Sequence, residues 1–313
     1  MIQIEKYQDI ENAIFIMGCD RSGTTFLGSL VGAHSECIVT PESQFKIDCY
    51  SEKEKMFFSA KEAFTKIINT KRFKIWNTNI LFTQAELGQI DNYSDLVLQI
   101  VKKYNIDKQH KTTAKIWVDH TPVNVEYVDL LKKFYPNAKF LHIIRDGRGV
   151  AASYKNVAWG PKTMHDIANH WLKKLAYGFA CEAKYPQDIL SIHYEDLLSD
   201  TETAVKKITN FVGIKYEKNM LNANGLIVPE YTKHQHKLVG QKADTSRMEA
   251  WKKTLTGREI ELFEYETKNM LNFLGYETLF SKPRGEKKHE RLIFAIKHKY
   301  KKIISKWKKR LKL

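Results

Sequence analysis

The stretch from Ala13 to Glu42, AIFIMGCDRSGTTFLGSLVGAHSECIVTPE, constrains the fold of this chain more than any other. It opens with an apolar, β-prone run, continues with the loop GCDRSGTT, and ends in a helix-compatible run that starts at Phe26. A strand, a glycine-bounded loop and a helix start together form a cradle for a phosphate-like anion. The loop N–H groups point inward, and the helix offers its unpaired first donors and the positive end of its dipole.

The loop matches half of a P-loop. Gly18 and Gly23 have the spacing of G-x-x-x-x-G, and Thr24-Thr25 follow where a P-loop has Lys-Ser/Thr. In P-loop NTPases that lysine reaches the β- and γ-phosphates. Because Arg21 supplies the charge here from inside the loop, the sequence predicts a phosphate-type site that suits ATP with magnesium poorly. The alternative is an ordinary turn between a strand and a helix.

The rest of the chain alternates between strand and helix patterns. We expect strands at 36–40, 114–118, 138–144 and 188–193, and helices at 123–134, 147–154, 163–183, 201–212 and 257–273. This alternation predicts a P-loop-like α/β fold of three layers, with a central parallel sheet flanked by helices. Arg21, Glu42, His120 and Arg145 each come just after a predicted strand, where ligands bind in such sheets.

Two segments depart from this alternation. Residues from about 46 to 112 have helical apolar spacing, for example at 52–68 and 93–104, and we expect a helical insertion that forms one wall of an acceptor cleft or serves as helical filler. Residues 222–246 are polar and predict a long loop, with Thr245-Ser246 capping a helix that carries Arg247 and Trp251. We predict one α/β domain over 1–281, with a basic amphipathic tail over 282–313.

Two motifs resemble the sulfotransferases that use 3′-phosphoadenylyl sulfate (PAPS). The sequence RSGTT after a strand resembles the family's 5′-phosphosulfate loop, and KFLHIIRDGRGVAAS, residues 139–153, resembles its 3′-phosphate segment. With the weaker marks YEDL at 194–197 and LGY at 274–276, the resemblance runs from about Ala13 to Tyr276 and is strongest to the branch that contains the tyrosylprotein sulfotransferases. It implies PAPS as sulfo donor and no metal. The implied donor-binding residues are Arg21, Ser22, Gly23, Thr24, Thr25, Arg145, Ser153, Tyr194 and Arg247.

The resemblance also implies catalytic roles for Arg21, Glu42 and His120. Arg21 would stabilise charge on the leaving phosphate, and Glu42 matches the position of the catalytic glutamate in the tyrosylprotein branch. A solvated loop glutamate or a helix cap is the alternative for Glu42. His120 stands where relatives often carry lysine. A protonated histidine would stabilise the bridging oxygen, a neutral one would act as a second base, and a third role would be to order its own loop.

Other residues carry weaker expectations. The resemblance also implies that Arg247 and Trp251 close over the nucleotide. Relatives often have a basic residue directly before the corresponding tryptophan, whereas this chain has Ala250, so the resemblance is weaker at this point. Arg148 is expected to pair locally with Asp146. The histidine pairs 165/170 and 234/236 lack further zinc ligands nearby and are expected at the surface.

The net charge of +15 is concentrated in the tail. Residues 282–313 contain 14 Lys/Arg and 2 Asp/Glu, so the tail carries +12 and the preceding 281 residues carry only +3. This distribution argues against a nucleic-acid-binding face on the domain. Residues 291–313, RLIFAIKHKYKKIISKWKKRLKL, have apolar residues at helical spacing between lysines and arginines, which favours a helix lying on an anionic membrane surface. A solvated helix packed on the domain and a nucleic-acid-binding tail are the alternatives.

The sequence also gives expectations about compartment and acceptor. No apolar run approaches the ~20 residues of a membrane span, no secretory signal opens the chain, and the four cysteines form no CxxC pair. We therefore expect a cytoplasmic protein with reduced thiols, at the inner face of the membrane if the tail binds there. The acceptor would then be a glycan, a glycolipid or another hydroxyl compound of the cell envelope. A P-loop small-molecule kinase and a non-catalytic nucleotide- or glycan-binding protein are the competing functions.

Overall fold

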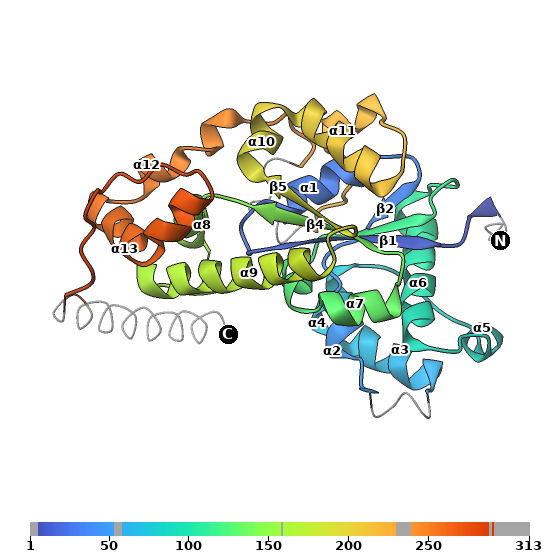
Figure 1. The fold of residues 1–313 in the computed structure, drawn as a ribbon. Helices are drawn as coiled ribbons and strands as arrows, with labels where there is room; N and C mark the ends of the chain where they lie inside the picture. The colour runs from blue at the N-terminus through green and yellow to red at the C-terminus, as the bar shows by residue number, and fades with distance from the viewer. Residues whose placement is uncertain (1–5, 53–57, 158, 230–238, 288–289, 291–313) are drawn as a thin grey trace, which may run out of the picture. The chain divides into compact units, whose positions relative to one another are not determined.

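The computed structural model describes residues 6–52, 58–157, 159–229, 239–287 and 290 (Figure 1). Its centre is a five-stranded sheet of order β2-β3-β1-β4-β5 in which all neighbouring strands are parallel. The strands are β1 Asn12–Gly18, β2 Cys37–Val39, β3 Ile116–Asp119, β4 Lys139–Ile144 and β5 Ile189–His193. Helices connect and flank the strands, which confirms the predicted α/β class.

The helices follow the sequence prediction closely, and α8, α11 and α13 have the predicted bounds. The α-helices are α1 Thr24–Val31, α2 Phe45–Asp48, α3 Ala60–Asn69, α4 Lys71–Ile75, α5 Gln84–Gly88, α6 Tyr93–Tyr104, α7 Val128–Phe134, α8 Gly147–Tyr154, α9 Met164–Lys184, α10 Tyr194–Ser199, α11 Thr201–Val212, α12 Ala250–Thr254 and α13 Gly257–Phe273. The structure also contains a π-helix, η3 Asn105–Gln109, and the 3₁₀-helices η4 Pro122–Glu126, η5 Lys218–Asn222 and η7 Thr245–Arg247. Among the described residues, no helix is both long enough and apolar enough to cross a membrane.

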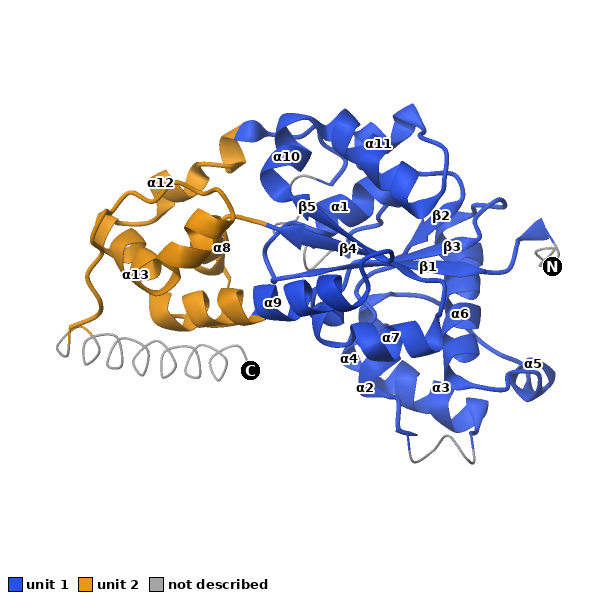
Figure 2. Cartoon of the chain, in the orientation of Figure 1, with its two compact units in different colours: residues 1–144, 174–245 blue, residues 145–173, 246–313 orange. Residues whose placement is uncertain are grey.

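The chain forms two compact units (Figure 2). Unit 1 comprises residues 1–144 and 174–245 and contains the whole sheet, and unit 2 comprises residues 145–173 and 246–313. The tail prediction falls largely on residues 291–313, which lie outside the described residues. The predicted boundary at 281/282 stays a prediction.

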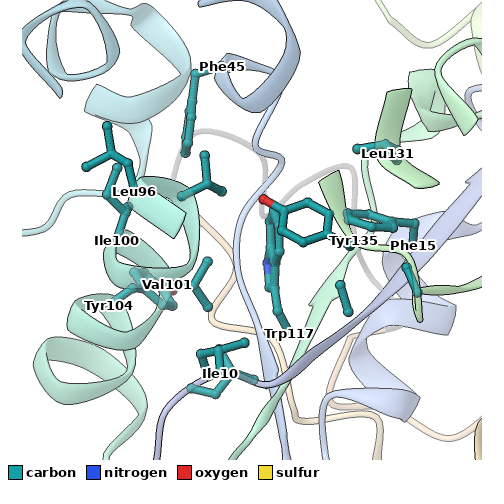
Figure 3. Close-up of a cluster of buried hydrophobic side chains, with 14 of the residues drawn as sticks. Ile10, Phe15, Phe45, Leu96, Ile100, Val101, Tyr104, Trp117, Leu131 and Tyr135 are labelled. Atoms are coloured by element: carbon teal, nitrogen blue, oxygen red, sulfur yellow. The ribbon is translucent and has the colours of Figure 1, made fainter. Parts of the chain in front are cut away.

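The helical insertion contributes to the core of unit 1 instead of forming a separate body. Its helices α2 to α6 account for most of the predicted range 46–112. Phe45, Ile100 and Tyr104 belong to the same buried cluster as Phe15 of β1 and Trp117 of β3 (Figure 3). The rings of Phe15 and Trp117 meet edge to face with centroids 5.4 Å apart, a geometry that adds to the gain from burial. The insertion therefore helps to fix the sheet whose strand ends carry the predicted site.

Two local predictions are wrong. The predicted helix 123–134 is divided at Tyr127 into η4 and α7, because the side chain of Asn124 is held by Asp119 and by the backbone oxygen of Ile16. The predicted cap at Thr245-Ser246 does not start the helix that carries Trp251. These residues form η7, and α12 starts separately after Glu249, where the indole of Trp251 packs on the guanidinium of Arg148.

Candidate active site

The loop after β1 is bent by residues with unusual backbone angles. Arg21 has φ 70°, which is uncommon for a residue with a side chain and is found disproportionately at functional sites. Gly23 has φ 103°, and a β-carbon there would lie 2.6 Å from Cδ2 of Tyr194, so only glycine suits the position. Tyr194, the first residue after β5, is thereby in contact with the loop, and its expected contact with the nucleotide stays a prediction.

The start of α1 offers unpaired donors. Its N-cap residue, Gly23, provides no side-chain cap, and its first turn has no acidic residue. Ser22 is 1% exposed, and its hydroxyl has no hydrogen-bond partner among the described residues. Buried polar groups are nearly always paired, so an unpartnered hydroxyl beside an uncapped helix start indicates a ligand with acceptor oxygens. The hydroxyl-bearing residues Thr24 and Thr25 are also buried at this point.

Glu42 follows β2 and is held by the helical insertion. Its side chain is 27% exposed, and Arg72 of α4 places NH1 3.0 Å from its Oε2. Trp76 donates from Nε1 to the backbone oxygen of Glu42 at 3.3 Å. Arg72 was not predicted as a site residue, because the spacing of two residues 30 positions apart does not indicate that they are in contact. Arg72 orients the carboxylate while leaving it open to solvent on one side.

His120 follows β3 and is almost fully buried. It is 4% exposed, its ring lies against α1 at Gly28, and neither ring nitrogen has a hydrogen-bond partner in the described part of the chain. Burial lowers the pKa of His120, although the carboxylates of Glu42 and Asp119 oppose this effect. The imidazole is therefore neutral near pH 7, with one nitrogen able to donate and the other able to accept. An ordering role for His120 through hydrogen bonds of its own ring has no support in this geometry.

Unit 2 contains the residues predicted to bind the 3′-phosphate. Arg145 is the first residue after β4, and its Nε would lie 2.9 Å from a β-carbon at Gly149, so the guanidinium rests on α8. Its NH2 donates to the backbone oxygen of Arg247 at 3.4 Å. Ser153 is half-buried on the same helix. Arg145, Ser153 and Arg247 thus belong to one unit, and their joint action with the loop of unit 1 stays a prediction.

Arg148 is bound inside unit 2. Its Nε donates to Asp146 Oδ1 at 3.0 Å, and its NH1 donates to Glu264 Oε1 at 2.7 Å. Its guanidinium carbon lies 4.0 Å from the centroid of a Trp251 ring, and both side chains are buried. The expected pairing with Asp146 is confirmed. Trp251 supports this cluster, and Asp146 caps α8 by accepting from the Arg148 N–H at 2.8 Å.

The structure describes one of the two histidine pairs singled out in the sequence, His165 and His170. His165 is exposed and pairs with Glu266 at 2.9 Å, and the ring of His170 packs near Tyr154. The pair His234/His236 lies outside the described residues. Within those residues, no group of three or more His, Cys, Asp or Glu side chains is arranged to hold a metal ion.

This chain is similar in sequence to known and putative sulfotransferases. The model of the Sulfotransferase family matches residues 13–218 of this chain. A putative protein-tyrosine sulfotransferase of Caenorhabditis briggsae is 24% identical over 287 residues, which cover 88% of this chain and 92% of that protein. Protein-tyrosine sulfotransferase A of Caenorhabditis elegans is 26% identical over 222 residues, which cover 68% of this chain and 53% of that protein.

Two solved structures have the same fold. The sulfotransferase domain from the curacin biosynthetic pathway has a TM-score of 0.57 at 18% identity, with 87% of this chain and 100% of that chain covered. The sulfotransferase domain from the Synechococcus PCC 7002 olefin synthase has a TM-score of 0.61 at 16% identity, with 87% and 97% covered. At these identities the similarity is one of fold.

Proposed function

This chain belongs to the sulfotransferase family, and we propose that it moves a sulfo group from PAPS to an acceptor hydroxyl. One observation carries the proposal. The buried hydroxyl of Ser22, at the uncapped start of α1, lacks a partner among the residues that the structure describes, and it lies in a loop whose positive charge comes from Arg21. Such a loop suits the phosphosulfate group of PAPS better than a nucleoside triphosphate, which P-loop enzymes bind with a lysine and magnesium.

The donor is proposed to be held at two places. Arg21, Ser22 and the hydroxyls of Thr24 and Thr25, with the N–H groups of α1, would bind the 5′-phosphosulfate, and Tyr194 would contact the nucleotide beside Gly23. Arg145 and Ser153 would bind the 3′-phosphate, with Arg247 next to them. An arginine fork and a hydroxyl about two helical turns from it are a suitable pair for one phosphate group.

Transfer is proposed to occur in line. The acceptor oxygen forms a bond to sulfur while the bond from sulfur to the bridging oxygen breaks, and adenosine 3′,5′-bisphosphate leaves. Glu42 takes the proton of the acceptor hydroxyl, with its carboxylate oriented by Arg72. Arg21 and the N–H groups of α1 stabilise the charge that develops on the leaving phosphate. Neutral His120 donates a hydrogen bond towards the transferred group.

The acceptor is proposed to be a glycan or glycolipid of the cell envelope. The support is the basic amphipathic sequence at 291–313, which would place the enzyme on the inner membrane face beside such acceptors. The protein-tyrosine sulfotransferases among the relatives favour a second candidate acceptor, a peptide tyrosine. Radiolabelled transfer from PAPS to envelope glycans, envelope lipids and tyrosine peptides, run in parallel, distinguishes the two. Label only in the peptides would exclude the envelope acceptor.

The donor is tested by calorimetry. Adenosine 3′,5′-bisphosphate should bind equally well with magnesium and with a chelator. ATP binding that depends on magnesium, together with no affinity for the bisphosphate, would instead favour the kinase. Bisphosphate binding without transfer to any acceptor would favour the non-catalytic binding protein.

Membrane association is tested by flotation with liposomes. The full chain should float with anionic vesicles at low salt, and a chain ending after Glu290 should not, because basic residues each contribute about 1 kcal/mol near an anionic surface. Ending after Glu290 preserves the ion pair between Glu290 and Arg258 of α13, 2.7 Å long. Equal flotation of the two chains would remove the membrane proposal and the choice of acceptor that rests on it.

A further inference from the structure

A single buried carboxylate joins the segment that carries Glu42 to the segment that carries His120. Asp119 is the last residue of β3, and its side chain is fully buried. Five donors bind it: Lys46 Nζ at 3.1 Å, Thr121 N–H at 3.0 Å, Thr121 Oγ1 at 3.0 Å, Asn124 Nδ2 at 2.7 Å, and Ser43 Oγ. A carboxylate with five donors is fixed in position, and so are the groups that donate to it.

The network carries a buried ion pair. Lys46 is as fully buried as Asp119. Burial acts to raise the pKa of Asp119, but Lys46 and the hydrogen bonds from Ser43 and Asn124 lower it to about 2, so the group is a carboxylate at neutral pH. Buried ion pairs are weak sources of stability, because desolvation offsets most of the attraction. The pair therefore calls for a role other than stabilising the core.

The donors come from both sides of the site. Ser43 is adjacent to Glu42, Lys46 lies on the short helix that follows it, and Thr121 is adjacent to His120. The segment that carries Glu42 and the segment that carries His120 are also hydrogen-bonded directly, since the Ser43 N–H donates to Thr121 Oγ1 at 3.0 Å. Through Asn124, whose Nδ2 also donates to the backbone oxygen of Ile16 at 3.0 Å, the network reaches β1 ahead of the phosphate loop.

We propose that Asp119, through Ser43, Lys46 and Thr121, is the positioning residue that holds Glu42 and His120 in one fixed arrangement for transfer. The inference rests on the proposed function, since it assigns Glu42 and His120 to that reaction. Misplacing a reacting group by about 1 Å costs roughly 100-fold in rate. The network should therefore act on the turnover number, and it should leave bisphosphate binding, which belongs to the loop and to unit 2, nearly unchanged.

The test uses Thr121→Val in the full chain, with Thr209→Val as matched control. Both threonines are fully buried in unit 1, but Thr209 on α11 donates only to the backbone oxygen of Lys206 in its own helix. Thr121→Val should lower kcat for transfer into a fixed extract of envelope glycans and lipids by about 10- to 100-fold, and should change the Kd of the bisphosphate less than about threefold. Thr209→Val should leave both unchanged. Equal kcat in the two variants would overturn the proposal.

A second variant and a second measurement complete the test. Asp119→Asn should lower kcat further, and if it fails to fold because Lys46 loses its partner, Thr121→Val decides alone. Hydrogen exchange on the ligand-free protein should be faster in both 42–46 and 120–124 in Thr121→Val and unchanged in Thr209→Val. Faster exchange in one segment alone, or in neither, would overturn the coupling of the two segments. A wild-type chain that neither binds the bisphosphate nor transfers sulfate would refute the proposed function, and the exchange data would still decide the coupling.

Discussion

Replacing Ser22 by alanine should affect stability and binding in opposite directions. In the ligand-free protein the Ser22 hydroxyl is buried and has no partner in the described part of the chain, a state that costs about 1–3 kcal/mol. Ser22→Ala removes that cost, so the free energy of unfolding should rise by about 1 kcal/mol. The same hydroxyl is proposed to donate to the phosphosulfate. A hydrogen bond to a charged group is worth about 1.5–3 kcal/mol, so bisphosphate affinity should fall roughly 10- to 150-fold.

Ser29→Ala is the matched control for this prediction. Ser29 is fully buried on α1, but its hydroxyl already donates to the backbone oxygen of Phe26 at 2.7 Å. Its removal should lower the free energy of unfolding by about 1 kcal/mol and leave affinity unchanged. Urea unfolding of the free protein and calorimetry with the bisphosphate measure the two quantities. Ser22 has no role in donor binding if Ser22→Ala destabilises the chain as Ser29→Ala does, or if Ser22→Ala keeps full affinity for the bisphosphate.

Three further predictions concern other parts of the site. Glu42→Gln should abolish transfer and keep the Kd of the bisphosphate within about threefold, since the side chain acts on the acceptor; near-normal turnover would pass the role of base to another group. Gly149→Ala should weaken bisphosphate binding roughly tenfold, because its β-carbon would lie 2.9 Å from Arg145 Nε. Gly257→Ala is the control and should not weaken binding, because no atom of the described residues lies near a β-carbon at that position. Equal calorimetric affinities of the two variants for the bisphosphate would refute this prediction. The pKa of Asp119 in the folded protein is about 2, below its usual value, so its contribution to stability should be present above about pH 4 and should be lost as pH falls towards 2. Denaturant unfolding at several pH values should show this loss in the wild type. In Asp119→Asn the free energy of unfolding should depend less on pH.

Much of the fold could be predicted from patterns within short stretches. Continuous apolar runs identified the strands of a parallel sheet, and the helix predicted at 257–273 is observed as α13, which starts at a capping box of Thr256 and Glu259. The division at Tyr127 could not be predicted, because it depends on Asn124 reaching β1, a contact between distant residues. A tertiary contact of this kind can override the local preference of a segment for a continuous helix.

The site was predicted where a motif lies close to the end of one strand. The loop around Arg21 follows its strand as predicted, whereas the contact of Tyr194 with Gly23 was not predicted, because Tyr194 was expected to touch the nucleotide. Arg72 and the pair Lys46–Asp119 were missed, because their partners lie 30 and 73 positions away and an isolated lysine or aspartate in a sequence looks like a solvated side chain. His120 was placed correctly after its strand, but the lack of partners for its ring nitrogens among the described residues depends on packing that the sequence does not show.

The division of the chain into two units has a consequence for the order of synthesis. Unit 2 is assembled from residues 145–173 and from residues after 245, so its first segment leaves the ribosome long before its second. Arg148 finds its partners Trp251 and Glu264 only in that second segment, and Arg145 finds the backbone of Arg247 there. At ~5–20 residues per second, several seconds separate the two segments, while the strands of unit 1 are already complete. A nascent chain thus carries its phosphate loop early, and the arginine expected to grip the 3′-phosphate acquires its support last.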